Sequence, residues 1–280
     1  MNPVEEIKTK AEEIQREVKP WIEHLARLGL AARGFVYLVL GLLTLKAARG
    51  LGSAEIDQDK AFLEIFLQPF GGVVLVIIAV GLTGYALWQL VLAVEDPEGA
   101  GANLKGLLRR ASYTVGSLAH AGLALTAGRR VLGFSSSGSE ETARDVTASL
   151  LALPFGQGVI VLAGLVVAGV GLVHFYRVFK ADFERQLRAG AMSMTWKKWA
   201  VSLGRLGHAA LGLVYCLIGF FLVQAALEYD PDKAGGLGEA LQALASQPNG
   251  AWVLGGIAAG MIAYGVFALI LARYRKIYLG

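Results

Sequence analysis

Residues 27–45 read RLGLAARGFVYLVLGLLTL, and residues 205–223 read RLGHAALGLVYCLIGFFLV. Both stretches begin with Arg-Leu-Gly and then place glycine and tyrosine at the same offsets. Each is apolar over nearly the roughly 20 residues that a helix needs to cross the hydrocarbon layer. The chain therefore carries at least two copies of one membrane-spanning segment.

The rest of the chain has the same composition. Of its 280 residues, 55% are hydrophobic and 17% are charged, whereas soluble domains carry about 25% charged residues. A large soluble helical bundle is the alternative, but it would place polar stripes inside each apolar block, and these blocks have none. Five blocks are long enough to span a bilayer and the third is marginal. The blocks are Leu28–Leu45, Val73–Val94, Val115–Ala127, Val159–Phe179, Leu206–Leu227 and Ala251–Ala272.

A threefold duplication relates the six blocks. Each odd span begins with arginine and has glycine seven residues later, and each even span opens with proline two residues before glycine. In units one and three, glycine follows twelve residues after the proline and tyrosine four residues later, whereas unit two carries Val166 and Val170 there. The repeat-motif residues are Arg27, Gly34, Tyr37, Gly41, Pro69, Gly71, Gly81, Tyr85, Arg109, Gly116, Pro154, Gly156, Arg205, Gly212, Tyr215, Gly219, Pro248, Gly250, Gly260 and Tyr264.

The expected fold is an all-α, polytopic bundle of six transmembrane helices, made of three tandem helix hairpins. We expect an N-terminal arm over 1–26 and repeats over 27–96, 109–180 and 205–275. Because each unit crosses twice, all units share one orientation, and a pseudo-threefold axis along the membrane normal should relate them. We interpret the recurrent glycines as positions of close helix packing. Short amphipathic connectors are predicted at Asp57–Leu67, Glu141–Leu153 and Gly238–Gln247.

Charge predicts the orientation. The side that holds the N-terminal arm, the loops at 95–111 and 177–205 and the C-terminus carries 19 of the 26 Lys and Arg residues, and the 22 acidic residues divide equally. Lys and Arg resist translocation, so both termini should be cytoplasmic. Basic loops beside anionic headgroups explain the excess of positive charge without a nucleic-acid partner, and membrane lipids are the expected contacts.

The motif resembles a bacterial membrane family catalogued as domain of unknown function 1206, whose members look like three tandem two-span units. Arg27, Gly34, Tyr37 and Gly41 fit its pattern, and so do the corresponding residues of the third unit. The middle unit diverges, because Ala119 stands where the tyrosine would be. The resemblance implies a fold and a membrane location, but no activity and no catalytic residues.

Few polar residues lie at membrane depth, where each is a functional candidate. His120 and His174 are weak candidates for haem ligation, because two imidazoles on neighbouring spans can hold one iron. Arg33 and Lys46 lie close enough to the ends of their span to snorkel to the headgroups. Without a cofactor, the expectation is a non-enzymatic structural or accessory component. A small-solute transporter or channel is the alternative, although no carboxylate lies in the central part of any span.

No catalytic motif was found, including His-Glu-x-x-His, a phosphate-binding glycine loop or a Ser/His/Asp set. The tryptophans Trp21, Trp88, Trp196, Trp199 and Trp252 lie near the predicted span ends, as in an aromatic belt.

The N-terminal arm has a helical apolar stripe from Val4 to Leu25, with Pro20 expected to break or kink the helix after Val18. This arm should lie on the leaflet, dock on the bundle's own loops, or pair with a protein partner or a second copy.

Overall fold

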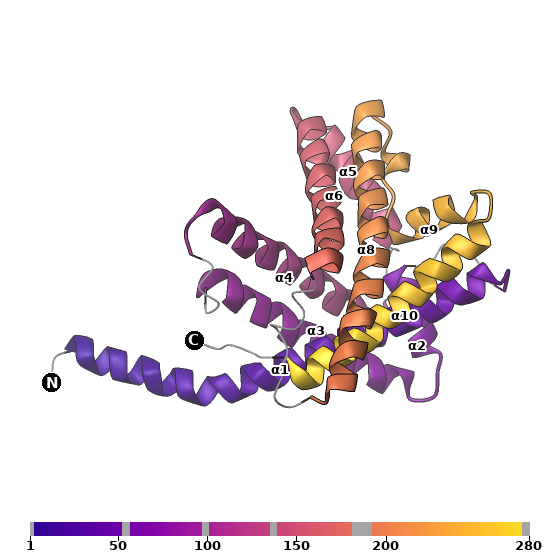
Figure 1. The fold of residues 1–280 in the computed structure, drawn as a ribbon. Coiled ribbons are helices and arrows are strands. Elements are labelled where there is room, and N and C mark those ends of the chain that lie inside the picture. Colours follow the sequence, from indigo (N-terminus) through magenta and orange to yellow (C-terminus); the bar gives the residue numbers. More distant parts are fainter. Residues whose placement is uncertain (1–2, 52–56, 97–100, 135–138, 181–191, 276–280) are drawn as a thin grey trace.

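The computed structural model describes residues 3–51, 57–96, 101–134, 139–180 and 192–275, and all regular structure in these ranges is helical. Figure 1 shows long helices with shorter helices between them. In chain order the elements are α1 (Pro3–Ala48), α2 (Gln58–Phe66), α3 (Gly71–Val94), α4 (Leu104–Val131), α5 (Ser139–Leu151), α6 (Gly156–Lys180), α8 (Met194–Glu228), η2 (Pro231–Lys233), α9 (Leu237–Ala245) and α10 (Gly250–Tyr274).

The N-terminal arm and the first span form one helix, α1. It runs from Pro3 to Ala48 without interruption, so the predicted break at Pro20 does not occur. A proline inside a helix removes one hydrogen bond, and bending can absorb this loss without ending the helix. Figure 1 shows α1 curving, with its N-terminal part extending away from the other helices. The side chains of residues 1–22 lie outside the described part of the structure.

Five of the described helices are long and apolar enough to cross a membrane: Glu23–Ala48 within α1, then α3, α6, α8 and α10. They are multi-pass membrane helices by length and composition. The helix α4 holds the third apolar block and has 28 residues, but it carries Arg109 and Arg110 near its start and Arg129 and Arg130 near its end. These arginines flank an apolar segment that the sequence had already marked as marginal.

The three predicted connectors are helices, α2, α5 and α9, and each leads into the same turn. Phe70, Phe155 and Asn249, each directly after the motif proline, have φ values of 62°, 69° and 65°. This left-handed conformation is uncommon for residues other than glycine. The repeat is therefore structural as well as sequential.

The glycine that follows each of these residues is sterically required. A Cβ on Gly71 would overlap the carbonyl of Ile65, one on Gly156 that of Leu150, and one on Gly250 that of Ala245. In all three turns the glycine N–H donates to the carbonyl three residues back, at 2.8–3.0 Å. The motif proline-x-glycine thus encodes a tight entry into each even span.

The long helices pack in the spatial order α4, α3, α1, α10, α8, α6. The contacts between units are made at glycines. A Cβ on Gly34 of α1 would lie 2.8 Å from the carbonyl oxygen of Gly265 in α10, and one on Gly171 of α6 would lie 2.7 Å from that of Gly212 in α8. About two turns after Gly34, Gly41 faces Ala258 and Ile262 of α10 in the same way. Backbones meet directly at these crossings, as in small-residue membrane packing.

The third interface between units, α3 with α4, uses a different chemistry. Gly116 lies against the amide of Gln89, and the Ser117 hydroxyl donates to the carbonyl of Ala86 at 2.8 Å. Ala86 occupies the register position of Gly171 and Gly265, counted from the motif proline. A side-chain hydrogen bond therefore replaces one of the glycine crossings.

Packing inside the hairpins differs between units. In unit one, Gly29 contacts Tyr85 and Gly81 contacts Leu28 and Ala32. Unit three repeats this arrangement, with Gly207 against Tyr264 and Gly260 against Leu206 and Ala210.

Unit two has Ala111 and Val166 where the other units have these glycines. Over their described lengths, α4 and α6 make at most marginal contact, in contrast to the paired helices of units one and three. A side chain at both crossing points keeps the helices apart. Two of the three hairpins are closed and the middle one is open.

We predict that Gly71→Ala destabilises the protein by about 1–3 kcal/mol, because the new Cβ overlaps the Ile65 carbonyl and the turn has to shift. The matched control is Gly72→Ala, whose Cβ would lie 3.7 Å from Phe66, an ordinary contact. Thermal unfolding in detergent, followed by tryptophan fluorescence, measures both. Equal melting temperatures for the two variants would show that the turn is not constrained in this way.

Candidate functional site

Every long helix contributes to one cluster of arginine, tyrosine and histidine side chains. Its members are Arg33 and Tyr37 from α1, Tyr85 from α3, His120 from α4, His174 from α6, His208 and Tyr215 from α8, and Tyr264 from α10. The guanidinium of Arg33 lies 5.7 Å from the ring centroid of Tyr37, 5.9 Å from that of Tyr85 and 5.1 Å from that of Tyr264. Tyr37 and Tyr264 meet edge to face at 4.8 Å. Three aromatic rings thus surround one cation.

The prediction that the Arg33 side chain extends to the lipid headgroups is therefore wrong. Arg33 lies ten residues inside the span that starts at Glu23, which is about 15 Å along the helix. The rings around it come from three different helices, so its inward direction depends on neighbours that are distant in sequence. Lys46, by contrast, is exposed.

Most hydrogen-bonding groups of Arg33 are unused. One guanidinium nitrogen, Nη1, donates to the Tyr85 hydroxyl at 3.3 Å. The Nε atom is buried without a hydrogen-bond partner, although a guanidinium offers five N–H donors. No described Asp or Glu forms an ion pair with Arg33. Three other arginines do form ion pairs: Arg27 with Glu23, Arg130 with Asp59, and Arg144 with Glu239.

The surrounding rings offset only part of the cost of this charge. A cation–π contact contributes about 0.5–2 kcal/mol, and a hydrogen bond to a charged group about 1.5–3 kcal/mol. Removing an ion from water costs several kcal/mol in real proteins and about 20 kcal/mol in the idealised limit. The residue as a whole is half-buried, whereas its Nε atom is buried without a hydrogen-bond partner.

The two buried histidines of α6 and α8 bind each other. The Nδ1 atoms of His174 and His208 lie 2.7 Å apart, and their ring centroids are 4.7 Å apart. One Nδ1 must donate its proton and the other accept it. His208 also meets Tyr264 edge to face at 5.4 Å, and this contact joins the histidine pair to the rings around Arg33.

His120 is held separately, on α4. Its Nδ1 atom lies 2.6 Å from the carbonyl oxygen of Gly116, which requires the proton on Nδ1. Its ring packs edge to face on Tyr85 at 4.7 Å. The sequence had suggested His120 and His174 as a ligand pair, but the structure pairs His174 with His208. Within the described residues, no three His, Cys, Asp or Glu side chains gather as a metal site.

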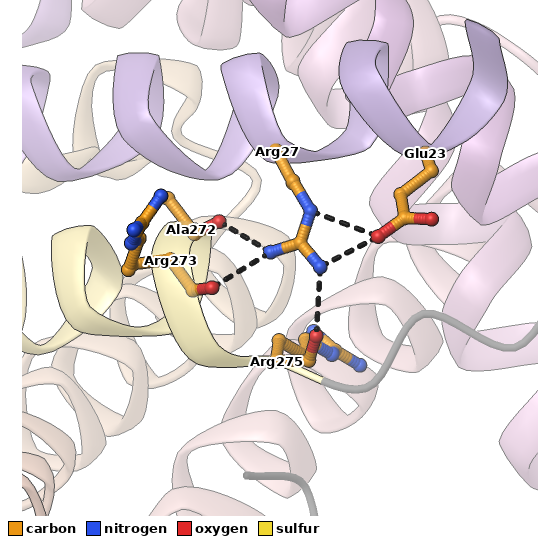
Figure 2. A network of polar contacts seen from close by, with 5 residues as sticks. All are labelled: Glu23, Arg27, Ala272, Arg273 and Arg275. Atoms are coloured by element: carbon orange, nitrogen blue, oxygen red, sulfur yellow. Dashed lines mark hydrogen bonds and ion pairs between the residues drawn. The ribbon is translucent and has the colours of Figure 1, made fainter. Parts of the chain in front are cut away.

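The motif arginine Arg27 connects α1 to the C-terminal end of α10 (Figure 2). Its guanidinium donates to the carbonyl oxygens of Ala272 at 2.8 Å, Arg273 at 2.9 Å and Arg275 at 3.4 Å. It also forms an ion pair with Glu23 at 2.6 Å. These carbonyls lie at the C-terminal end of α10, where helical carbonyls lack partners.

In unit two the corresponding bonds are made by Arg110 and not by the motif residue Arg109. Arg110 donates to the carbonyls of Ala93 at 2.6 Å and Val94 at 3.0 Å, at the end of α3. Arg109 is exposed and bonds to Tyr113 at 3.3 Å. Arg205 of unit three is exposed. In unit one the motif arginine therefore binds carbonyls at the end of a neighbouring helix. In unit two the next residue in the sequence, Arg110, makes these bonds.

Trp88 also departs from the expected aromatic belt. It is fully buried, and Arg275 lies over its ring, 4.5 Å from the centroid. Trp196, Trp199 and Trp252 are exposed as expected of belt residues. Trp21 lies outside the side chains that the structure describes.

These features define a multi-pass, all-helical membrane protein with a polar cluster in its interior. The chain belongs to the family described as Domain of Unknown Function (DUF1206), whose pattern matches it three times, at 28–96, 111–181 and 206–275. It is 34% identical over 262 residues to the uncharacterized protein YxxB of Bacillus subtilis, with 94% of each chain covered. No solved structure matches the chain. The family and its three tandem repeats agree with the sequence interpretation.

We predict that Arg27→Ala lowers stability by about 1–3 kcal/mol, because the end of α10 loses charge-assisted hydrogen bonds. Arg27→Lys should recover part of this loss, since an ammonium keeps the charge but not the planar fork. Arg205→Ala removes an exposed arginine from the same motif position and should change stability by less than about 0.5 kcal/mol. Thermal unfolding in detergent compares the three, and an Arg27→Ala variant as stable as Arg205→Ala contradicts the assigned role.

Proposed function

We propose that this protein is a non-enzymatic integral component of the bacterial cytoplasmic membrane with a structural or accessory role. The observation that carries this proposal is how the interior polar groups are used. His174 binds His208, His120 binds a carbonyl of its own helix, and Ser117 binds the carbonyl of Ala86. The His174–His208 and Ser117–Ala86 bonds connect neighbouring helices, the His120 bond stays within α4, and among the described residues none of these groups is a nucleophile beside a general base.

The proposed topology has six crossings, with α4 as the sixth and both termini in the cytoplasm. A helix of 28 residues is about 42 Å long, enough to span the hydrocarbon layer, with arginine pairs at both ends to reach the headgroups. The excess of Lys and Arg on the side of the termini supports the orientation. Equivalent turns in all three units support the proposed pseudo-threefold relationship.

A protein partner or a second copy is proposed to bind the N-terminal arm, with no role for nucleic acid. Figure 1 shows this part of α1 extending away from the bundle, which disfavours docking on the protein's own loops. Membrane lipid is the other surface on which an amphipathic helix can lie.

Transport or permeation of a small solute is the second candidate, and one observation favours it. The helices α4 and α6 make at most marginal contact over their described lengths, so helix packing closes the bundle less tightly on that side. This looser place lies inside unit two, and spaces between the helices of a bundle are among the places where small molecules bind.

Haem binding by the buried histidines is disfavoured by geometry. The direct contact of 2.7 Å between the Nδ1 atoms of His174 and His208 leaves no room for iron between these two nitrogens, since each Fe–N bond would be about 2 Å. The Nδ1–H of His120 bonds to the Gly116 carbonyl, which leaves Nε2 as its available ligand atom, but in the described part of the chain the ring of His120 contacts Tyr85 and not a second histidine. We therefore propose that the protein holds no haem.

Native purification in mild detergent tests the proposed function. A tagged full chain should be colourless when isolated from haem-replete cells, and a partner should co-elute or the protein should self-associate. Deletion of residues 2–19 should remove that association and leave the melting temperature of the bundle unchanged. A Soret band, or solute uptake into proteoliposomes without any associated protein, would contradict the accessory role.

A further inference from the structure

Arg33 has the features of a binding site that lacks its ligand. The side chain is a permanent cation, and no acidic side chain among the described residues interacts with it. The rings of Tyr37, Tyr85 and Tyr264 surround its guanidinium at 5.1–5.9 Å. Other arginines near the ends of the long helices have carboxylate partners, such as Glu23 for Arg27 and Asp59 for Arg130.

The surroundings of Arg33 provide further hydrogen-bond donors, and no carboxylate among the described residues pairs with it. Its guanidinium donates to the Tyr85 hydroxyl and also lies against Tyr37, whereas its Nε atom is buried without a hydrogen-bond partner. The ring centroid of Tyr264 lies 5.1 Å from the guanidinium carbon of Arg33. A tyrosine hydroxyl can accept a hydrogen bond and can also donate one to an anion. The rings around the Arg33 cation therefore come from neutral side chains.

Two more arginines extend the positive potential toward the cytoplasmic ends of the helices. Arg177 lies in the last turn of α6, and Arg275 follows α10 directly and lies over the ring of Trp88. A channel or cleft lined by one sign of charge attracts the opposite sign. Arg33, Tyr37 and Tyr215 are half-buried rather than sealed, and the neighbouring hairpin of α4 and α6 is open.

We propose that Arg33 is the centre of an oxyanion-binding site inside the bundle, completed by tyrosine hydroxyls. The ligand carries a phosphate or carboxylate group, because the planar fork of a guanidinium matches two oxygens of such a group. A free cytoplasmic oxyanion and the headgroup of an acidic phospholipid share this chemistry. This proposal adds a ligand class to the accessory role proposed above. The same binding site would be required if the anion were a fixed part of the structure and if it were transported.

The test is a titration of delipidated protein in detergent with sodium phosphate and with sodium acetate at constant ionic strength, followed by calorimetry and thermal unfolding. Wild type should bind one of these ions saturably and melt at a higher temperature. Arg33→Gln should weaken binding at least tenfold, whereas Arg205→Gln, at an exposed arginine, should bind as wild type does. Saturable binding that Arg33→Gln leaves unchanged, or no binding by wild type in detergent and in lipid, overturns the proposal.

A stability measurement separates this site from a structural role of Arg33. Without added anion, Arg33→Gln should melt at or above the wild-type temperature, because it removes an uncompensated charge. If Arg33 is instead needed to hold the tyrosines in place, Arg33→Gln melts lower in every buffer, and the proposal fails.

The source of the anion is decided in lipid nanodiscs. A headgroup ligand predicts that phosphatidylglycerol raises the melting temperature of wild type but not of Arg33→Gln, relative to phosphatidylcholine, and that added phosphate has no further effect. A free oxyanion predicts that phosphate or acetate stabilises wild type equally in both lipids.

Discussion

Direct contact between helix backbones at glycine is the interaction on which this fold depends. Lipid tails are as apolar as leucine, so no hydrophobic force drives membrane helices together, and close packing has to do so. Gly34 against Gly265 and Gly171 against Gly212 bring whole helices into contact between units. Gly29 and Gly207 do the same inside the first and third hairpins. Where unit two replaces these glycines by Ala111 and Val166, the hairpin stays open.

The units also differ in the polar side chains that they contribute to the interior cluster. Units one and three supply the tyrosines around Arg33, whereas unit two has Ala119 and Val170 at the corresponding positions and contributes His120 and His174 from other positions. The residues that make unit two divergent in sequence are therefore those that open its hairpin and change its contribution to the cluster. Loss of packing and gain of polar chemistry occur in the same repeat, as expected where a symmetric scaffold is adapted to a function.

The sequence predicts the local features of this protein well. Helix periods, connector helices and the entry turns follow from residues that act on their immediate neighbours, such as Pro69 and Gly71. The family and the three repeats follow from the same local pattern. A proline that does not end its helix, Pro20, is the exception, because the rest of α1 sustains the helix on both sides.

Features that depend on distant neighbours escape a sequence interpretation. The direction of the Arg33 side chain is set by Tyr85 and Tyr264, which lie on other helices. Trp88 is buried in an apolar cluster with residues of other helices, such as Leu30 and Leu271, and Arg275 lies over its ring. The pairing of His174 with His208 depends on the crossing of α6 and α8. An arginine ten residues inside a span, with four tyrosines at repeat positions, is the signal that could have indicated the cluster.

The central claim is that three hairpin units lie in one orientation in the membrane, and this claim depends on whether α4 crosses. Single-cysteine accessibility in intact cells measures it most directly, after the only cysteine is removed by Cys216→Ala. The account predicts that an impermeant maleimide labels Phe134→Cys and Ser246→Cys from outside, and labels Ala102→Cys and Thr195→Cys only after permeabilisation. Labelling of Ala102→Cys and Phe134→Cys from the same side would show that α4 does not cross, which would place units one and three in opposite orientations and contradict the account.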